Sequence, residues 1–191
     1  MKRLVCVLGS PKENGNGGTI AKKIAQVAES LGAQTQTFHL HSLNYRGCYA
    51  CMGCKSGSDV CVINDDLAEV LTAVREADAL VMTSPIYFGQ ISGQLKSFID
   101  RTFSFLVPDF LNAGNPSRLA PGKKCLFVLT QGQPDPSLYD VGPAYEGFFK
   151  WFGYETRLIR GLGMSGKADD PAMEPLLKQA EEMAKTLVAG L

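Results

Sequence analysis

Short apolar runs alternate along the chain with stretches in which apolar residues recur every three or four positions. The apolar runs at 3–8, 79–83, 125–130 and 154–159, and the alternating segment 34–40, predict five strands. Ile20, Ile24, Val27 and Leu31 form one apolar stripe, which predicts a helix over 19–31 that stops at Gly32. The same period predicts helices over 65–77, 91–103, 139–152 and 171–188.

Strands that alternate with helices favour an α/β fold with a parallel sheet and helices on both faces, because right-handed crossovers place them there. Five strands favour the doubly wound, flavodoxin-like order 2-1-3-4-5. In such a sheet a ligand binds beyond the carboxyl ends of the strands, at the switch point between strands 1 and 3. The loops after strands 1, 3 and 4 are therefore expected to form the site.

Length and charge are those of an ordinary globular protein. The 191 residues fit a single domain, 1–191, with a cysteine-rich insertion at about 46–63. Lys and Arg together number 19, as do Asp and Glu, so no overall field favours nucleic acid or a membrane as partner. The apolar stretch 4–8 is too short for a signal-peptide core, and we expect a cytoplasmic protein.

Four of the six cysteines are clustered, at positions 48, 51, 54 and 61. In a reducing compartment such clusters are more often metal-binding or catalytic than disulfide-bonded. The spacing is closer to compact ferredoxin-like ligation than to a zinc ribbon, in which two Cys-x2-Cys pairs lie ~15 to 20 residues apart. An iron-sulfur cluster is favoured, while redox-active or free thiols and zinc stay open. Cys6 and Cys125 fall in predicted strands and are expected to be buried and unreactive.

The loop after the first strand, from Gly9 to Thr19, consists mainly of small residues and hydrogen-bond donors and leads into a helix. Backbone N–H groups at a helix start, with Ser10, Asn16 and Thr19 beside them, suit a phosphate. The loop lacks the Gly-Lys-Ser/Thr of a nucleoside triphosphatase and the usual register of the Gly-x-Gly-x-x-Gly dinucleotide pattern.

The loop after the third strand, Ser-Pro-Ile-Tyr-Phe-Gly at 84–89, places two aromatic residues and a proline beside the expected crevice, where they could lie against a flat ring. The other polar candidates have simpler roles. His39 and His41 are expected to make local hydrogen bonds, as are Asp100 and Arg101. Asp65 and Asp66 suit a helix start. The aromatic residues at 103, 105, 110, 148, 149, 151 and 152 exceed the needs of one small core and could line a dimer interface or a substrate cleft.

Several of these segments, in this order, resemble a known family. They are Gly9-Ser10-Pro11-Lys12 with Asn16 and Thr19, Asp65-Asp66, the segment 84–89, Leu95-Lys96 and Asp100-Arg101. The chain is similar to the flavodoxin-like NAD(P)H-dependent FMN reductases and, within them, to the iron-sulfur flavoproteins. The family's first loop is usually shorter, with Asn directly before Thr, whereas Gly17-Gly18 intervene here.

The resemblance implies bound FMN and names its site. The residues expected at the phosphate are Ser10, Lys12, Asn16, Gly17, Gly18 and Thr19; those expected at the isoalloxazine are Pro85, Ile86, Tyr87, Phe88 and Gly89, with Thr130, Gln131 and Gly132 on the other side of the ring. Cys48, Cys51, Cys54 and Cys61 are similar to the motif that holds a [4Fe-4S] cluster in iron-sulfur flavoproteins.

The function that the resemblance implies is that of an FMN-dependent oxidoreductase. NAD(P)H would be the co-substrate, and hydride or electrons would pass through FMN to a second small-molecule or protein acceptor. The cofactor carries such chemistry, so no acid–base pair is required. With a cluster present, the protein could act as an electron carrier. The alternative is a thiol-based, redox-sensing, flavodoxin-like binding protein without turnover. A homodimer or homotetramer is expected.

Overall fold

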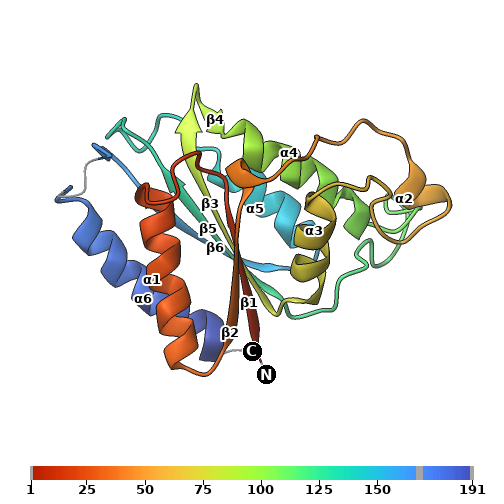
Figure 1. The fold of residues 1–191 in the computed structure, drawn as a ribbon, viewed down its shortest axis with the longest axis horizontal. Coiled ribbons are helices and arrows are strands. Elements are labelled where there is room, and N and C mark those ends of the chain that lie inside the picture. Colours follow the sequence, from red (N-terminus) through yellow and green to blue (C-terminus); the bar gives the residue numbers. More distant parts are fainter. Residues whose placement is uncertain (1, 167–169, 190–191) are drawn as a thin grey trace.

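A mostly parallel sheet forms the centre of the molecule. The computed structural model describes residues 2–166 and 170–189. The strands are β1 (Arg3–Leu8), β2 (Gln34–His39), β3 (Ala79–Tyr87), β4 (Gln90–Ile91), β5 (Lys124–Thr130) and β6 (Glu155–Gly161). The order is β2-β1-β3-β5-β6, all parallel, and β4 pairs antiparallel with the end of β3 (Figure 1). The predicted flavodoxin-like order is confirmed, with β4 as an additional short strand.

Helices cover both faces of this sheet (Figure 1). The two on one face are α1 (Asn16–Ser30) and α6 (Met173–Ala189), and those on the other are α3 (Leu67–Glu76), α4 (Gly93–Arg101) and α5 (Gly142–Trp151). The short helix α2 (Gly53–Ser56) lies within the cysteine segment, and 3-10 turns occupy Leu40–Ser42 and Thr102–Phe105. None of the helices in the described residues is long and apolar enough to span a membrane.

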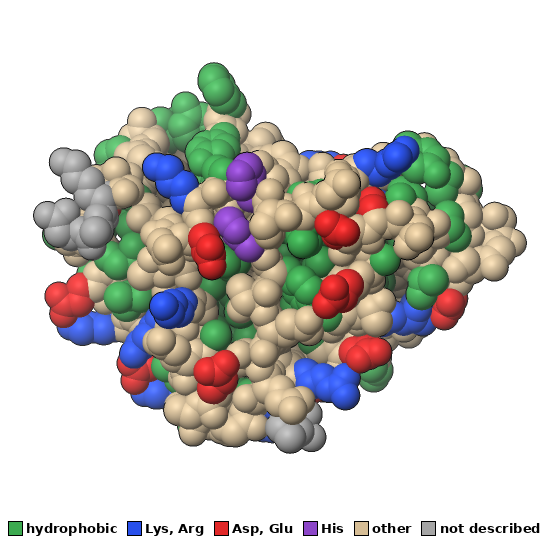
Figure 2. Space-filling model, in the orientation of Figure 1, with side chains coloured by type: hydrophobic (Ala, Val, Ile, Leu, Met, Phe, Trp, Pro, Cys, Tyr) green, Lys and Arg blue, Asp and Glu red, His purple; other side chains and the backbone are tan. Residues whose placement is uncertain are grey.

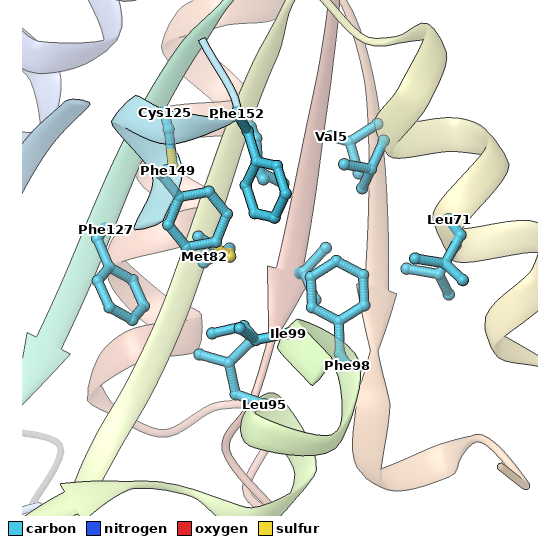
Figure 3. Close-up of a cluster of buried hydrophobic side chains, with 14 of the residues drawn as sticks. Val5, Leu71, Met82, Leu95, Phe98, Ile99, Cys125, Phe127, Phe149 and Phe152 are labelled. Carbon is cyan, nitrogen blue, oxygen red and sulfur yellow. The ribbon is translucent and has the colours of Figure 1, made fainter. Parts of the chain in front are cut away.

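The alternation of side chains along each strand divides the core in two. Val5 and Val7 of β1 face α3, α4 and α5, whereas Leu4 and Cys6 face α1 and α6. The first core contains most of the large aromatic side chains, several of which meet over β3 and β5 (Figure 3). The second is built largely from alanine and aliphatic residues. Cys6 and Cys125 are both buried, as predicted, and burial raises the pKa of the Cys6 thiol to about 12.

Several element boundaries differ from the prediction by a few residues; α1, for example, begins at Asn16 and not at 19. Two further differences, at the end of β3 and the start of α5, lie near the expected ligand crevice. β3 does not stop at 83 but continues to Tyr87, because Ser84 and Pro85 still pair with the end of β5. Phe88 and Gly89 both have positive φ, +48° and +77°, and form the two-residue turn into β4. The helix predicted from 139 begins at Gly142, because Tyr139 takes a left-handed conformation with φ of +59°.

Candidate functional site

The loop between β1 and α1 ends at an uncapped helix start. Gly15 is the N-cap of α1, no side chain caps it, and the first turn contains no acidic residue. The N–H groups of the first turn therefore lack side-chain acceptors, and they carry the positive end of the helix dipole. Ser10 Oγ accepts a hydrogen bond from Lys12 N at 3.1 Å, so this loop turns back on itself beside the helix start. The uncapped N-terminus of α1 therefore favours the binding of an anionic group.

Glycine is required where α1 meets the rest of the site. A side chain at Gly17 would place its Cβ 3.0 Å from Thr83 Oγ1, and one at Gly18 would come within 1.9 Å of the Glu13 carbonyl oxygen. Gly17 and Gly18 are buried, and without side chains there the backbone of the first turn of α1 lies directly against β3 and the loop that precedes the helix. The two-residue insertion that distinguishes this chain from the usual family pattern thus occupies the helix start itself.

A buried hydrogen-bond network joins the ends of β1 and β3 to α4. Ser92 N donates to Ser84 Oγ at 2.9 Å, and Ser92 Oγ donates to the Gly9 carbonyl at 2.6 Å. Ser92 Oγ also accepts from Leu95 N at 3.2 Å and so caps α4. Gly9 N donates to the Thr83 carbonyl at 2.8 Å. Two of the three predicted loops are therefore fixed relative to each other.

The histidine pair lies at the surface beside this network. His39 Nε2 donates to the Ser10 carbonyl at 2.8 Å and supports the first loop from β2. The rings of His39 and His41 lie 6.3 Å apart, and Figure 2 shows both at the surface among interspersed acidic and basic side chains. The predicted local role of His39 is confirmed.

The turn between β3 and β4 projects two aromatic side chains outward. Tyr87 is half exposed and the Phe88 side chain is fully exposed. Tyr139 packs on Gly89, where an added Cβ would lie 3.1 Å from Tyr139 Cδ1. Sequence reasoning missed Tyr139, because it was assigned to a helix. The turn and Tyr139 together form an aromatic rim at the carboxyl end of the sheet, with Pro85 and Ile86 half-buried below it.

The loop after β5 is held by its own polar side chains. Thr130 and Gln131 are buried, and Gln131 N donates to the Gly161 carbonyl at 2.8 Å. Gln131 Nε2 donates to the Leu138 carbonyl at 3.2 Å, while Arg160 Nη1 donates to the Pro136 carbonyl at 2.8 Å and pairs with Asp140 at 3.2 Å. Gly132 follows on the exposed side. This loop ends at the same edge of the sheet as the other two.

The residues of this edge fit a phosphorylated, flat-ringed cofactor. The helix start supplies donors for an anion, and the buried Thr83 Oγ1, which faces Gly17, has no hydrogen-bond partner among the described residues. The aromatic rim supplies apolar surface for a ring. All three groups of predicted FMN residues therefore meet at one end of the sheet.

The four clustered cysteines line one small cavity of about 20 Å³, together with Arg101 and Phe103. Cys54 is buried and Cys61 partly buried, whereas Cys48 and Cys51 are exposed. Ala50 and Met52 have positive φ, +55° and +59°, conformations that cost energy in residues other than glycine. Within 2–166 and 170–189, no three His, Cys, Asp or Glu side chains are grouped closely enough to hold a metal ion. The donor type suits a cluster, but the thiols as placed do not form its ligand cage.

Arg101 is the centre of the polar contacts around this cavity. Its side chain is fully buried, its Nε donates to Cys61 Sγ at 3.0 Å, and its two terminal nitrogens bind Asp65 at 2.8 and 3.1 Å. It also donates to the carbonyls of Arg46 and Ile63 at 3.0 and 3.1 Å. Both ends of the cysteine segment are thereby tied to α4.

Burial alone would raise the pKa of Asp65, but hydrogen bonds from Arg101 and from Arg46 N outweigh it and hold that pKa below its usual range. Asp65 also accepts from Leu67 N at 3.2 Å, so the expected helix-start role of this carboxylate is correct. The local polar contact expected for Arg101 is wrong, because its side-chain partners lie 36 to 55 residues away along the chain. Sequence reasoning also missed its contact with a clustered thiol.

Two further cations make contacts at the middle of the cysteine segment: Lys55, which belongs to the segment, and Arg118, which binds it from outside. Lys55 Nζ donates to the Phe103 and Leu106 carbonyls at 2.6 and 2.8 Å and lies 4.1 Å from the centre of the Phe103 ring. Burial lowers the pKa of Lys55, and the charge of the nearby Cys54 opposes that shift. Arg118 Nη1 donates to the Cys54 carbonyl at 3.0 Å. The thiols therefore lie in a positively charged environment.

Comparison with known sequences gives one family match. The profile of the family described as NADPH-dependent FMN reductase matches residues 2–136. An iron-sulfur flavoprotein of Methanosarcina thermophila is 32% identical over 100 residues, which cover 52% of each chain. An iron-sulfur flavoprotein of Archaeoglobus fulgidus is 31% identical over 103 residues, 54% of this chain and 46% of that one. The chain thus spans about half the length of these relatives.

Comparison with solved structures supports the fold. The FMN-dependent NADH-azoreductase of Bacillus anthracis, crystallised in complex with FMN, superimposes with a TM-score of 0.75 over 98% of this chain and 100% of that one, at 14% identity. The shared fold extends through β6 and α6, beyond the stretch that the family profile matches.

Proposed function

Because the chain belongs to the NADPH-dependent FMN reductase family, we propose that it binds FMN and is an oxidoreductase that takes electrons from NADH or NADPH and passes them to a second acceptor. The observation that carries the proposal is the uncapped start of α1, placed between β1 and β3 and opened by buried glycines. Bound FMN would supply the hydride and electron chemistry. The protein is further proposed to be cytoplasmic and to assemble as a homodimer or homotetramer.

The residues of the protein would bind, orient and shield the cofactor. Its phosphate is assigned to the start of α1, where the residues are Ser10, Lys12, Asn16, Gly17, Gly18 and Thr19. Its ring is assigned to the aromatic rim and the opposite loop, where the residues are Pro85, Ile86, Tyr87, Phe88, Gly89, Thr130, Gln131 and Gly132. The buried network of Ser84 and Ser92 supports this assignment, since it fixes the phosphate end relative to the ring end.

Reconstitution with FMN tests the core of the proposal. The purified protein is mixed with FMN, its flavin spectrum is recorded under anaerobic conditions, and NADH or NADPH is then added. We expect a bound-flavin spectrum that bleaches with one of the two nucleotides. Binding without bleaching would indicate an electron carrier. A protein that binds no FMN would contradict the proposal and favour the thiol-based redox sensor without turnover.

A charge substitution tests where the phosphate binds. Lys12 is an exposed lysine in the first loop, and Lys178 is an exposed lysine on α6, paired with Glu174. Lys12→Met should weaken FMN binding by roughly tenfold, about the effect of one lost charge-assisted contact, and leave riboflavin binding unchanged. Lys178→Met should change neither affinity. An equal loss for FMN and riboflavin in the Lys12 variant would place the phosphate elsewhere.

We also propose that Cys48, Cys51, Cys54 and Cys61 hold a [4Fe-4S] cluster, which would supply one-electron chemistry. The proposal is supported by the shared cavity, by the cations around it and by the similarity to proteins named iron-sulfur flavoproteins. Cations near the sulfurs suit a cluster whose four thiolate ligands carry negative charge. Assembly would require the exposed stretch 48–51 to adjust.

Metal analysis after anaerobic purification tests the cluster. We expect a brown protein with about four irons per chain. Cys54→Ser should lose the iron, whereas Cys125→Ala, in the core away from this cavity, should keep it. Stoichiometric zinc would contradict the cluster, and four reactive thiols without metal would indicate redox-active or free cysteines instead.

A further inference from the structure

A second hollow lies between α4 and α5, away from the residues assigned to FMN. This α4–α5 cavity has a volume of about 660 Å³, within the range of small-molecule sites. Its wall is mainly apolar, and its principal members are Ile99, Phe103, Leu106, Phe148, Trp151 and Phe152. None of the residues assigned to the FMN phosphate or ring lines it. It is therefore a separate candidate site.

The aromatic walls of the cavity pack against further aromatic rings. The Phe110 ring packs against Phe103 on one side and Trp151 on the other, with centroids 5.4 Å apart in each pair. Phe152 packs against Phe149 in the core at 5.9 Å. Trp151 and Phe148 are 39% and 53% exposed, so the mouth of the cavity is itself aromatic. A slot lined by aromatic rings favours a flat aromatic ligand over a flexible chain.

The polar groups around the cavity favour an uncharged ligand. Lys96 pairs with Asp100 at 2.5 Å, and Asp140 pairs with Arg160 at 3.2 Å, so the charges on its lining are already compensated. Tyr145 is buried, and its hydroxyl donates to Gln90 Oε1 at 3.5 Å, so this polar group also has its partner within the protein. Burial raises the pKa of Tyr145, with Lys96 opposing that shift, so the hydroxyl stays protonated and uncharged.

The geometry points to a binding site in the α4–α5 cavity for an uncharged, flat aromatic molecule, separate from the FMN crevice. Gln90, directly after the Phe88-Gly89 turn, lies at one part of its lining, and Cys48 of the cysteine segment at another. A ligand there would lie between the aromatic rim and the clustered thiols. The inference goes beyond the proposed function and does not depend on it.

The single tryptophan of the chain makes the cavity directly observable. Because Trp151 lines the cavity, its emission reports on occupancy. The probe is 2-methyl-1,4-naphthoquinone, titrated into the full chain without FMN, with calorimetry as the second measurement. We expect saturable quenching and a matching binding isotherm. Quenching that rises linearly without saturation would overturn the inference.

Two matched substitutions locate the binding. Ala144 lines the cavity at an exposed position of α5, and Ala120 is exposed but lies outside it. Ala144→Phe should fill the mouth and weaken probe binding at least about tenfold, and Phe148→Ala should weaken it by removing one wall. Ala120→Phe should stay within about twofold of the wild type. Equal affinity in the Ala144 and Ala120 variants would place the probe elsewhere.

Sedimentation and flavin binding separate the remaining outcomes. If Ala144→Phe converts an oligomer to a monomer while the wild type shows no probe binding, this face is an interface between copies of the chain and the inference fails. FMN affinity is measured in parallel. If the wild type binds the probe but not FMN, the proposed function alone fails. If it binds FMN but not the probe, this inference alone fails.

Discussion

The Arg101 side chain joins helix α4 to the cysteine segment through several long-range hydrogen bonds. Its partners lie 36 to 55 residues away along the chain, at Asp65, Cys61, Ile63 and Arg46. A buried arginine is stable only when its donors are satisfied, because an unpaired charge costs several kcal/mol in the interior. The cysteine segment and α4 are therefore expected to fold and unfold together.

Removal of Arg101 should destabilise the protein strongly. Arg101→Met leaves the Asp65 carboxylate without its buried partner and should lower the free energy of unfolding by about 3–5 kcal/mol. Arg101→Lys keeps the charge but loses the bidentate contact with Asp65, so this variant should also be less stable than the wild type. The measurement is urea unfolding. Arg157→Met, in an exposed pair with Glu155, is the control and should change stability by at most about 1 kcal/mol. Equal effects in the two methionine variants would contradict this account.

The Asp65 carboxylate should make the free energy of unfolding fall at acid pH. Its pKa is lowered in the folded state, so its contribution is complete above the unfolded pKa of about 3.9 and is lost as the pH falls through the folded value. Stability should therefore drop below about pH 5. Asp65→Asn should be less stable at neutral pH but lose less between pH 5 and pH 3. A variant with the wild-type acid slope would show that other carboxylates dominate.

At the scale of elements, the turn between β3 and β4 determines the shape of the aromatic rim. Gly89 has a φ of +77°, and Tyr139 covers the position where a side chain would begin. A side chain there meets both backbone strain and a ring that cannot move without leaving the rim. The turn and the left-handed Tyr139 are thus one unit.

Gly89→Ala should lower the free energy of unfolding by about 1–3 kcal/mol, because alanine is strained at positive φ. The added methyl group should also displace Tyr139. We expect weaker FMN binding together with a lower unfolding midpoint, measured by flavin titration and thermal denaturation. The matched control is Gly93→Ala, since Gly93 opens α4 with negative φ and nothing within 4 Å of an added Cβ. That change should be neutral or stabilise by up to about 1 kcal/mol. Unchanged FMN affinity in the Gly89 variant would separate the rim from the flavin.

The sequence predicted the elements with a regular period and failed where tertiary pairing overrides local preference. The strands and the helices α1, α3 and α6 follow from apolar spacing, because each buries one defined face. β3 was ended at 83, since Ser-Pro favours a turn, but its pairing with β5 carries the strand onward. The cysteine cluster was visible as a spacing, whereas Arg101 beside it was not, because its partners are distant in sequence. The edge of the sheet that holds the candidate FMN residues was predictable, and Tyr139 was not.

At the scale of the whole molecule, FMN should act as a stabilising ligand. A cofactor that binds only the folded state raises the free energy of unfolding by about 2.7 kcal/mol when its concentration is one hundred times its dissociation constant. For a chain of 191 residues this corresponds to a midpoint increase of about 5–10 °C. Thermal denaturation with FMN, riboflavin and no ligand should show the largest increase for FMN, because riboflavin lacks the phosphate. An equal increase for both would argue against an anion site at α1.

The position of the cysteine segment between β2 and β3 has a consequence for how the chain is made. β1 pairs with β3, Leu4 with Ala79 through Leu8 with Thr83, so the centre of the sheet closes only after the segment has been synthesised. Pairings between distant strands form slowly. During translation the four thiols are therefore exposed before the structure that surrounds them exists. Their metal or oxidation state is expected to be set while the nascent chain is still open, and expression under anaerobic, iron-replete conditions should determine what the folded protein contains.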